Sequence, residues 1–215
     1  MDPSLYVILD RAAARGLDLE AILDGALAGG CRMIQLREKE WPSGRLLPLA
    51  ERLCERCHRA GAAFIVNDRV DLALAVAADG VHLGQDDLPP RAARPLLGPG
   101  MILGRSTHSL AQARQAKDDG ADYIAVGALF PTVTKRDFQL VGPDLLRQVR
   151  PETSRPLIGI GGITPENAAE VIRAGADGVA VISAVCGAPD PAAAARRFLE
   201  AIRTARDLTG RPRPL

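Results

Sequence analysis

The feature that most constrains the fold is a pattern that repeats eight times along the 215-residue chain. Each repeat has an amphipathic segment of helical period, a small-residue turn, a short β-branched run and a polar loop. Short, mostly apolar runs are typical of parallel strands that are covered on both faces. The pattern predicts strands over Leu5–Leu9, Met33–Arg37, Ala63–Asn67, Gly80–Leu83, Met101–Gly104, Tyr123–Gly127, Leu157–Gly161 and Gly178–Ile182.

Helical segments separate these strands. The periodicity predicts helices over Leu19–Ala28, Arg45–Arg59, Val70–Ala77, Pro90–Leu97, Leu110–Asp118, Pro143–Val149, Pro165–Ala174 and Pro191–Leu208. Three junctions resemble one another, Ala78-Asp79-Gly80, Ala121-Asp122-Tyr123 and Ala176-Asp177-Gly178, and each leads from a helix into the next strand.

Eight such units predict one α/β domain, a single (β/α)8 TIM barrel over residues 1–208, followed by a frayed, Pro-rich basic tail over residues 209–215. An open doubly wound sheet is the alternative. It is disfavoured by the count of eight and by Gly159-Ile160-Gly161-Gly162, where Thr164 takes the place of the last glycine of a dinucleotide-binding fingerprint.

The bulk properties exclude several classes of protein. A net charge of +1 with interspersed acids and bases argues against a nucleic-acid partner. No apolar run approaches the roughly 20 residues of a membrane span, so we expect no membrane partner and a cytoplasmic protein, compatible with a homo-oligomer. The four cysteines are expected to be reduced there. The haem-like Cys54-Glu55-Arg56-Cys57-His58 lies in a segment with helical periodicity, and we reject a haem site there.

Two aspartates follow consecutive strands. Asp68 comes just after the third predicted strand and Asp87 just after the fourth. Because parallel neighbouring strands end side by side, the two carboxylates can converge on one ion. Carboxylates without a nearby thiolate or imidazole suit Mg²⁺, which leaves other positions for water and phosphate. The alternative is that each aspartate only caps the helical segment that follows it.

Cations follow the second strand. Alternation places Gln35, Arg37 and Lys39 on one side, toward the mouth of the barrel, where (β/α)8 enzymes carry their active sites. The alternative is that Arg37 and Lys39 pair with Glu38, Glu40 or other neighbouring acids.

The sixth predicted strand is followed by an unusually long loop. Thr132 and Thr134 offer hydroxyl groups there, and Lys135 offers a positive charge. Long loops at a barrel mouth are typically lids or binding loops, so we expect an anionic ligand. An exposed polar loop without a ligand is the alternative.

The seventh and eighth strands end in Gly161-Gly162 and Ile182-Ser183. Backbone N–H groups of these neighbouring loops predict a phosphate cradle, although simple turn glycines would give the same sequence.

The fifth strand leads to Ser106 and His108. Ser106 could donate to a substrate and His108 could act as a base, while Ser106 or Ser109 could instead cap the next helix. His82, within the fourth strand, is better explained as a core residue with satisfied hydrogen bonds than as a ligand.

Together these residues predict a two-acid metal site, cations beside it and a separate phosphate cradle. Such a mouth would take two phosphorylated substrates, or one long substrate with a phosphate at each end. An end of the site that carries a metal ion, Lys and Arg is better matched to a diphosphate leaving group than to a monophosphate.

Five motifs in order resemble the thiamine-phosphate synthase family and cover nearly the whole barrel. They are Ile34-Gln35-Leu36-Arg37-Glu38-Lys39, Ile65-Val66-Asn67-Asp68, Gly84-Gln85-Asp86-Asp87, Pro131-Thr132-Val133-Thr134-Lys135 and Gly159-Ile160-Gly161-Gly162-Ile163-Thr164. The resemblance implies a transferase that joins hydroxymethylpyrimidine diphosphate to hydroxyethylthiazole phosphate, giving thiamine phosphate and diphosphate.

The resemblance also implies site residues. The pyrimidine diphosphate would be held by Gln35, Arg37, Lys39, Asn67, Ser106 and Lys135, with Mg²⁺ on Asp68 and Asp87. The thiazole phosphate would be held by Thr132, Thr134, Gly162, Ile182 and Ser183. We expect Arg37, Lys39, Ser106 and Lys135 to be the catalytic residues of a dissociative substitution at the pyrimidine methylene.

Two other functions fit parts of the sequence. The related thiazole tautomerase resembles Gly104-Arg105-Ser106-Thr107-His108-Ser109, and His108 would then transfer the proton without a metal. A non-catalytic phosphate-binding barrel is the other alternative.

Overall fold

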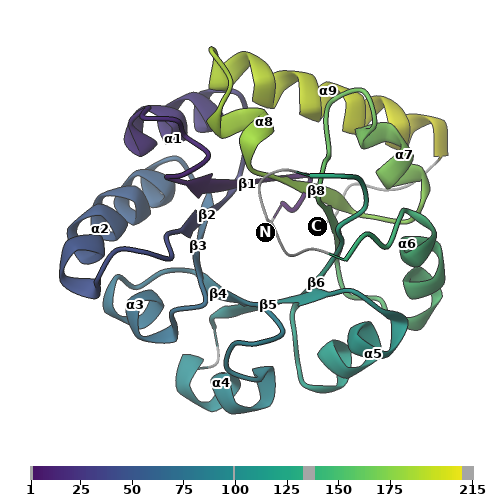
Figure 1. Ribbon diagram of the computed structural model, residues 1–215, viewed down its shortest axis with the longest axis horizontal. Coiled ribbons are helices and arrows are strands. Elements are labelled where there is room, and N and C mark those ends of the chain that lie inside the picture. The colour runs from purple at the N-terminus through teal and green to yellow at the C-terminus, as the bar shows by residue number, and fades with distance from the viewer. Residues whose placement is uncertain (1, 99, 133–138, 210–215) are drawn as a thin grey trace.

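The computed structural model describes residues 2–98, 100–132 and 139–209, in which eight parallel strands close into a barrel in the order β1 to β8. Figure 1 looks down this barrel, with the strands forming an inner ring. The strands are β1 (Leu5–Asp10), β2 (Met33–Arg37), β3 (Ala63–Asn67), β4 (Gly80–Leu83), β5 (Ile102–Thr107), β6 (Tyr123–Val126), β7 (Leu157–Ile160) and β8 (Gly178–Val181). Pairing of β1 with both β2 and β8 closes the ring.

Helices surround the strands (Figure 1). They are α1 (Leu19–Ala28), α2 (Ser43–Arg59), α3 (Val70–Ala75), α4 (Pro90–Leu97), α5 (Leu110–Asp118), α6 (Asp144–Val149), α7 (Ala168–Arg173), α8 (Ser183–Cys186) and α9 (Pro191–Thr209), with a 3₁₀ turn η1 (Arg150–Glu152). The predicted (β/α)8 barrel is confirmed. The predicted tail begins at the last residue of α9, and residues 210–215 lie outside the described residues.

Several boundaries differ from the prediction. Strand β5 continues to Thr107 rather than ending at Gly104, so Ser106 lies within a strand. Helix α7 begins at Ala168 instead of Pro165, because Asn167 Oδ1 accepts a hydrogen bond from Thr164 N at 2.8 Å and holds the intervening residues in a turn. The short elements α8 and η1 were not predicted from the periodicity, since one turn of helix carries too little of a 3.6-residue pattern.

Alternation along the strands divides the core in two. Outward-facing residues such as Val7 and Leu9 pack against the helices, while Tyr6 and Ile8 point into the barrel. The inner cluster is small and consists of Tyr6, Ile8, Met33, Ile65, Tyr123, Ile158 and Ala180. Two tyrosines in this interior bring hydroxyl groups into the middle of the barrel, directly beneath the mouth.

The three repeated Ala-Asp junctions have a common structural role at the N-terminal end of the barrel. The carboxylates of Asp79, Asp122 and Asp177 accept hydrogen bonds from the backbone N–H groups of Phe64, Leu103 and Leu157, at 2.7, 2.8 and 2.8 Å. Each aspartate thus provides a hydrogen-bond acceptor for a backbone N–H group at the start of the preceding strand. Each also contacts a basic side chain, which is His58, Arg94 and Arg150 respectively.

We expect Asp177→Ala to lower the free energy of unfolding by about 2 kcal/mol, because it removes a charge-assisted hydrogen bond to Leu157 N and the Arg150 partner together. Urea unfolding of the purified protein measures this. Asp118→Ala is the control, since Asp118 is exposed and contacts Lys117 at a distance of 3.8 Å, so its effect should stay within about 0.5 kcal/mol. Equal effects of the two substitutions would contradict the role given to the junction aspartates.

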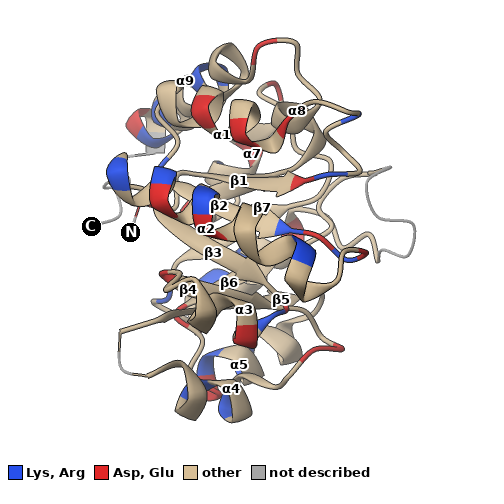
Figure 2. Ribbon diagram, turned by 90° about the vertical axis from the view of Figure 1, so that its left-hand side faces the viewer, with Lys and Arg blue, Asp and Glu red and all other residues tan. Residues whose placement is uncertain are grey.

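Opposite charges are interspersed on the outer helices, as Figure 2 shows for the helices that face the viewer. Glu20 of α1 accepts from Arg52 and Arg56 of α2, at 2.8 and 2.7 Å. Among the residues that the structure describes, no helix combines the length and the apolar character that crossing a membrane requires.

Candidate active site

A cavity of about 210 Å³ opens at the carboxyl ends of the strands. It gathers residues from β1 to β5, from β7 and from the loops that follow the strands. Of the site residues predicted from the sequence, those that line it are Gln35, Arg37, Lys39, Asn67, Asp68, Asp87, Ser106, Thr132 and Ile182. His108 also lines this cavity, which is called the mouth cavity below.

A smaller cavity of about 50 Å³ adjoins the mouth cavity. Gly162 and Ser183 line the smaller one, while Thr132, Gly161 and Ile182 line both. The residues predicted to form a phosphate cradle therefore line a second, smaller cavity beside the larger one. Thr134 and Lys135, which the sequence also placed here, lie outside the described residues.

Asp68 and Asp87 both line the mouth cavity, and each carboxyl group changes the pKa of the other. Burial, followed by the hydrogen bond with Asp87, raises the pKa of Asp68 above its ordinary value. Burial also acts to raise the pKa of Asp87, but the hydrogen bonds from Asp68 and from Gly84 N lower it overall. The pair therefore shares a proton or a cation more readily than it holds two negative charges.

The interpretation of these aspartates as helix caps is wrong. The residue before α3 is Arg69, so Asp68 does not occupy the capping position. Asp87 Oδ2 accepts from Gly84 N at 2.7 Å within its own loop, whereas Pro89 precedes α4. Asp68 has a left-handed backbone with φ of +62°. Such a conformation is uncommon outside glycine and is concentrated at functional sites.

The donor set of this pair fits a hard cation. The two carboxylates, with Lys39 Nζ 3.1 Å from Asp68 Oδ2, offer oxygen ligands rather than thiolate or imidazole. Within the described part of the chain no three His, Cys, Asp or Glu side chains cluster as metal ligands. Mg²⁺ is commonly bound by only one or two carboxylates together with substrate phosphates, so the pair suits Mg²⁺ better than a metal that needs a complete protein cage.

Arg37 and Lys39, at the end of β2, pair with neighbouring acids, as the alternative proposed from the sequence expected, but the acids are Asp10 and Asp68 and not Glu38 or Glu40. Arg37 Nη1 donates to Asp10 Oδ2, at the end of neighbouring β1. Glu38 and Glu40 instead accept from Arg11, at 2.7 and 2.5 Å. Asp10 was missed by the sequence reasoning, although its position at the carboxyl end of a strand was a signal that could have found it.

Ser106 and His82 form a hydrogen bond at the floor of the mouth cavity, with His82 Nε2 2.8 Å from Ser106 Oγ. Burial, and then the charge of Arg105, lower the pKa of His82 to about 4, so the imidazole is neutral near pH 7. His82 is a core residue with satisfied hydrogen bonds, as predicted. Ser109, not Ser106, caps α5, accepting from Gln112 N at 3.2 Å. His108 Nδ1 donates to Gly127 O at 2.5 Å.

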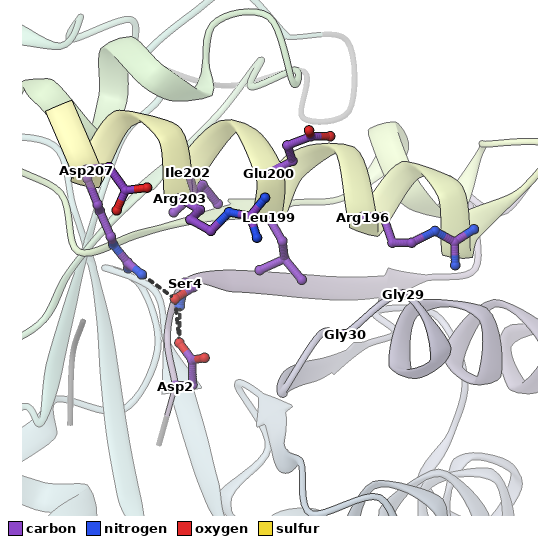
Figure 3. A pocket seen from close by; sticks show the side chains of 11 residues that line it. Asp2, Ser4, Gly29, Gly30, Arg196, Leu199, Glu200, Ile202, Arg203 and Asp207 are labelled. Atoms are coloured by element: carbon purple, nitrogen blue, oxygen red, sulfur yellow. Dashed lines mark hydrogen bonds between the residues drawn. The ribbon is translucent and has the colours of Figure 1, made fainter. Parts of the chain in front are cut away.

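A larger cavity of about 540 Å³ lies at the opposite end of the barrel, between α9, α1 and the start of β1 (Figure 3). Ser4 Oγ donates to Asp2 there at 2.5 Å and accepts from Arg206 at 2.8 Å. Acidic and basic side chains such as Glu200 and Arg203 alternate along its α9 wall. This cavity is larger than the mouth cavity, but the perturbed carboxylates and the convergent polar groups are at the mouth.

Known proteins resemble this chain over almost its whole length. Residues 5–185 match the family described as thiamine monophosphate synthase. A thiamine-phosphate synthase of Moorella thermoacetica is 53% identical over 94% of this chain and 97% of that protein, and one of Haloquadratum walsbyi is 48% identical over 93% and 91%. A solved thiamine phosphate pyrophosphorylase from Pyrococcus furiosus superposes with a TM-score of 0.87 at 39% identity, covering 94% of this chain and 96% of that one.

Proposed function

Because the chain belongs to the thiamine monophosphate synthase family, we propose that it is a thiamine-phosphate synthase that joins hydroxymethylpyrimidine diphosphate to hydroxyethylthiazole phosphate. The products would be thiamine phosphate and diphosphate. The chain is accordingly an enzyme of the transferase class, and the group transferred is a pyrimidinylmethyl group. The observation that supports this assignment most strongly is a pair of interacting carboxylates, with Lys39 3.1 Å from one of them, in a cavity that Arg37 also lines and that adjoins a second, smaller cavity.

The diphosphate end of the mouth cavity would be formed by acids and cations together. Asp68 and Asp87 would hold Mg²⁺, whose binding would neutralise negative charge on the diphosphate as that charge develops. Arg37 and Lys39 would approach the same oxygens from β2 and the loop after it. Lys135 would contribute a further charge from its loop. Cations directed at a developing charge in a partly buried site are the main source of rate enhancement in this kind of reaction.

The pyrimidine ring would lie deeper in the mouth cavity, above the barrel interior. Gln35, Asn67 and Ser106 would hydrogen-bond to it, and all three line that cavity. The apolar side chains Ile8 and Ile160 line it too and would contact the ring faces. Burial of a flat ring between apolar walls with a few directed polar groups is typical of such sites.

The thiazole phosphate would enter the smaller compartment. Gly162, Ile182, Ser183 and Thr132 line it, and Thr134 would join them. Gly161 and Gly162 have φ of +99° and +64°, a backbone that brings main-chain groups close to a ligand. This placement would hold the thiazole ring over the mouth cavity, with its nitrogen toward the pyrimidine methylene.

The chemistry we propose is a dissociative substitution. The bond between the methylene carbon and the diphosphate oxygen breaks with its electron pair on the diphosphate, and the electron-rich aminopyrimidine stabilises the cationic methylene. The thiazole nitrogen then donates its lone pair to that carbon. The protein would supply charge stabilisation and alignment of the two substrates, and alignment alone can contribute several kcal/mol.

The test is to incubate the protein with both substrates, with and without Mg²⁺, and to detect thiamine phosphate by mass spectrometry. We expect product only with both substrates and Mg²⁺. Isomerisation of a thiazole by the wild type, abolished in His108→Asn, would support the tautomerase instead. Tight binding of both phosphates without turnover would support a non-catalytic barrel.

A further inference from the structure

A continuous row of hydrogen-bonded side chains crosses the barrel beneath the mouth cavity. Gln35 Nε2 of β2 donates to the Tyr6 hydroxyl of β1 at 2.5 Å, and that hydroxyl lies 2.9 Å from the Tyr123 hydroxyl of β6. The Tyr123 hydroxyl lies 2.8 Å from His82 Nδ1 of β4, and His82 Nε2 lies 2.8 Å from Ser106 Oγ of β5. We call these five residues the transverse row.

The two tyrosines of the transverse row are buried inside the barrel, and the other three members line the mouth cavity. Tyr6 and Tyr123 are 1% and 0% exposed and belong to the apolar cluster inside the barrel. Gln35 and Ser106, its two end members, both line the mouth cavity. A buried hydroxyl without a partner costs about 1–3 kcal/mol, so a row of this kind is stable only when each bond in it is made.

Packing holds the middle of the transverse row in place. The Tyr123 ring stacks on His82 with centroids 5.5 Å apart and meets Tyr6 edge to face at 5.8 Å. The ring occupies the space over Gly104, where a Cβ atom would lie 2.0 Å from Tyr123 Cζ. The positions of the two hydroxyl-bearing rings are therefore set by the barrel and not by the ligand.

The chemistry of the groups allows one direction of donation along the row. A phenol has a single hydrogen, and a neutral imidazole has one N–H and one acceptor nitrogen. Gln35 donates to Tyr6, so within the row the Tyr6 hydrogen finds an acceptor only if Tyr6 donates to Tyr123, and Tyr123 then donates to His82 Nδ1. His82 then carries its hydrogen on Nε2 and donates to Ser106 Oγ. Ser106 keeps its own hydrogen for the cavity, while Gln35 keeps its carbonyl oxygen and its second amide hydrogen outside the row.

We propose that Tyr6, Tyr123 and His82 are positioning residues that make Ser106 a hydrogen-bond donor and Gln35 an acceptor toward the bound ring. This inference rests on the proposed function, because it concerns how that site selects its pyrimidine. The favoured ligand offers an acceptor, such as a ring nitrogen, to Ser106 and a donor, such as an exocyclic amino group, to Gln35. An oxo analogue exchanges these roles and leaves polar groups of the site unpaired.

The tautomer of His82 can be observed directly. The chain contains three histidines, so two-bond ¹H–¹⁵N correlation spectra are simple, and the missing signals of His82→Gln assign the residue. We expect wild-type His82 to carry its proton on Nε2 alone near pH 7. A proton on Nδ1, or on both nitrogens, would reverse or abolish the proposed direction and overturn the inference.

The second test measures selectivity. Calorimetry with Mg²⁺ and without the thiazole phosphate gives the dissociation constants of the amino pyrimidine diphosphate and of its oxo analogue. We expect the wild type to prefer the amino compound roughly a hundredfold, because the unmatched ligand leaves buried polar groups unpaired. In Tyr123→Phe the imidazole is released from its donor, and the preference should fall below roughly tenfold.

A matched control separates positioning from a general loss of packing. Thr107 lies on the same strand as Ser106 but outside the transverse row. Thr107→Val removes a buried hydrogen bond to Ala125 O and should leave the preference for the amino compound unchanged. An unchanged preference in Tyr123→Phe would overturn the inference. Failure of the wild type to bind the amino compound at all would instead overturn the proposed function.

Discussion

Asp68→Asn is expected to lower kcat by roughly a thousandfold, about 4 kcal/mol of lost transition-state stabilisation. The substitution keeps the size and the left-handed backbone that asparagine also tolerates, with φ of +62° at this position. It removes one of the two carboxylates that would hold Mg²⁺ beside the departing diphosphate. Initial rates of thiamine phosphate formation at saturating substrates measure the effect.

The same variant should fold at least as well as the wild type when Mg²⁺ is absent. Burial and the neighbouring Asp87 raise the pKa of Asp68, so a neutral amide relieves repulsion between the two side chains. Asp71→Asn is the matched control, because Asp71 lies on nearby α3, is paired with Arg69 and is not among the described residues that line the mouth cavity. A fast Asp68→Asn enzyme, or an equally slow Asp71→Asn enzyme, would remove the basis for a catalytic acid pair.

Gly162→Ala is expected to reduce kcat/KM for the thiazole phosphate roughly a hundredfold, since a displacement of about 1 Å in a positioned substrate can cost that much. Gly162 has φ of +64°, and an added Cβ atom would lie 2.3 Å from Pro131 O and 2.8 Å from Phe130 Cβ. The main chain next to Thr132 would have to move. The smaller cavity, which Thr132 and Gly162 both line, would change shape.

The KM for the pyrimidine diphosphate should change by less than about threefold in this variant, because the strain is local to the other compartment. Gly98→Ala is the control, as Gly98 has φ of +71° but no described atom within 4 Å of the added Cβ. Gly98→Ala introduces the same kind of backbone strain as Gly162→Ala, but its Cβ atom collides with no described atom, so the variant should retain wild-type kinetics. Equal losses for both substrates of Gly162→Ala would argue against separate compartments.

The barrel could be predicted from the sequence because turn residues precede its short apolar strands and polar residues follow them. Strand β3 begins after a glycine turn and ends at Asn67, and its bounds were predicted to the residue. Strand β5 was predicted to end three residues too early, because Arg105, Ser106 and Thr107 interrupt the apolar pattern. Strands that enclose a polar site lose their apolar signal where their side chains take part in it.

The residues of the mouth cavity could be predicted for a topological reason. Once parallel strands are accepted, everything just beyond their carboxyl ends is brought together, which is why Lys39, Asp68 and Asp87 were found as a group. Spacing along the chain says nothing about which side chains then pair. The contact between Asp10 and Arg37 is one example, and the contact between Tyr6 and Tyr123, which lie 117 residues apart, is another.

The direct test of the acid pair is to count bound metal with Mn²⁺ in place of Mg²⁺, using electron paramagnetic resonance in the presence of the pyrimidine diphosphate alone. The wild type should bind a single Mn²⁺ per chain. In the double variant Asp68→Asn/Asp87→Asn, the affinity for that ion should fall by at least roughly a hundredfold, in line with the loss of its protein ligands. Binding of the same amount of Mn²⁺ with the same affinity by both proteins would show that these carboxylates do not hold the ion, and the proposed role of the acid pair in catalysis would be wrong.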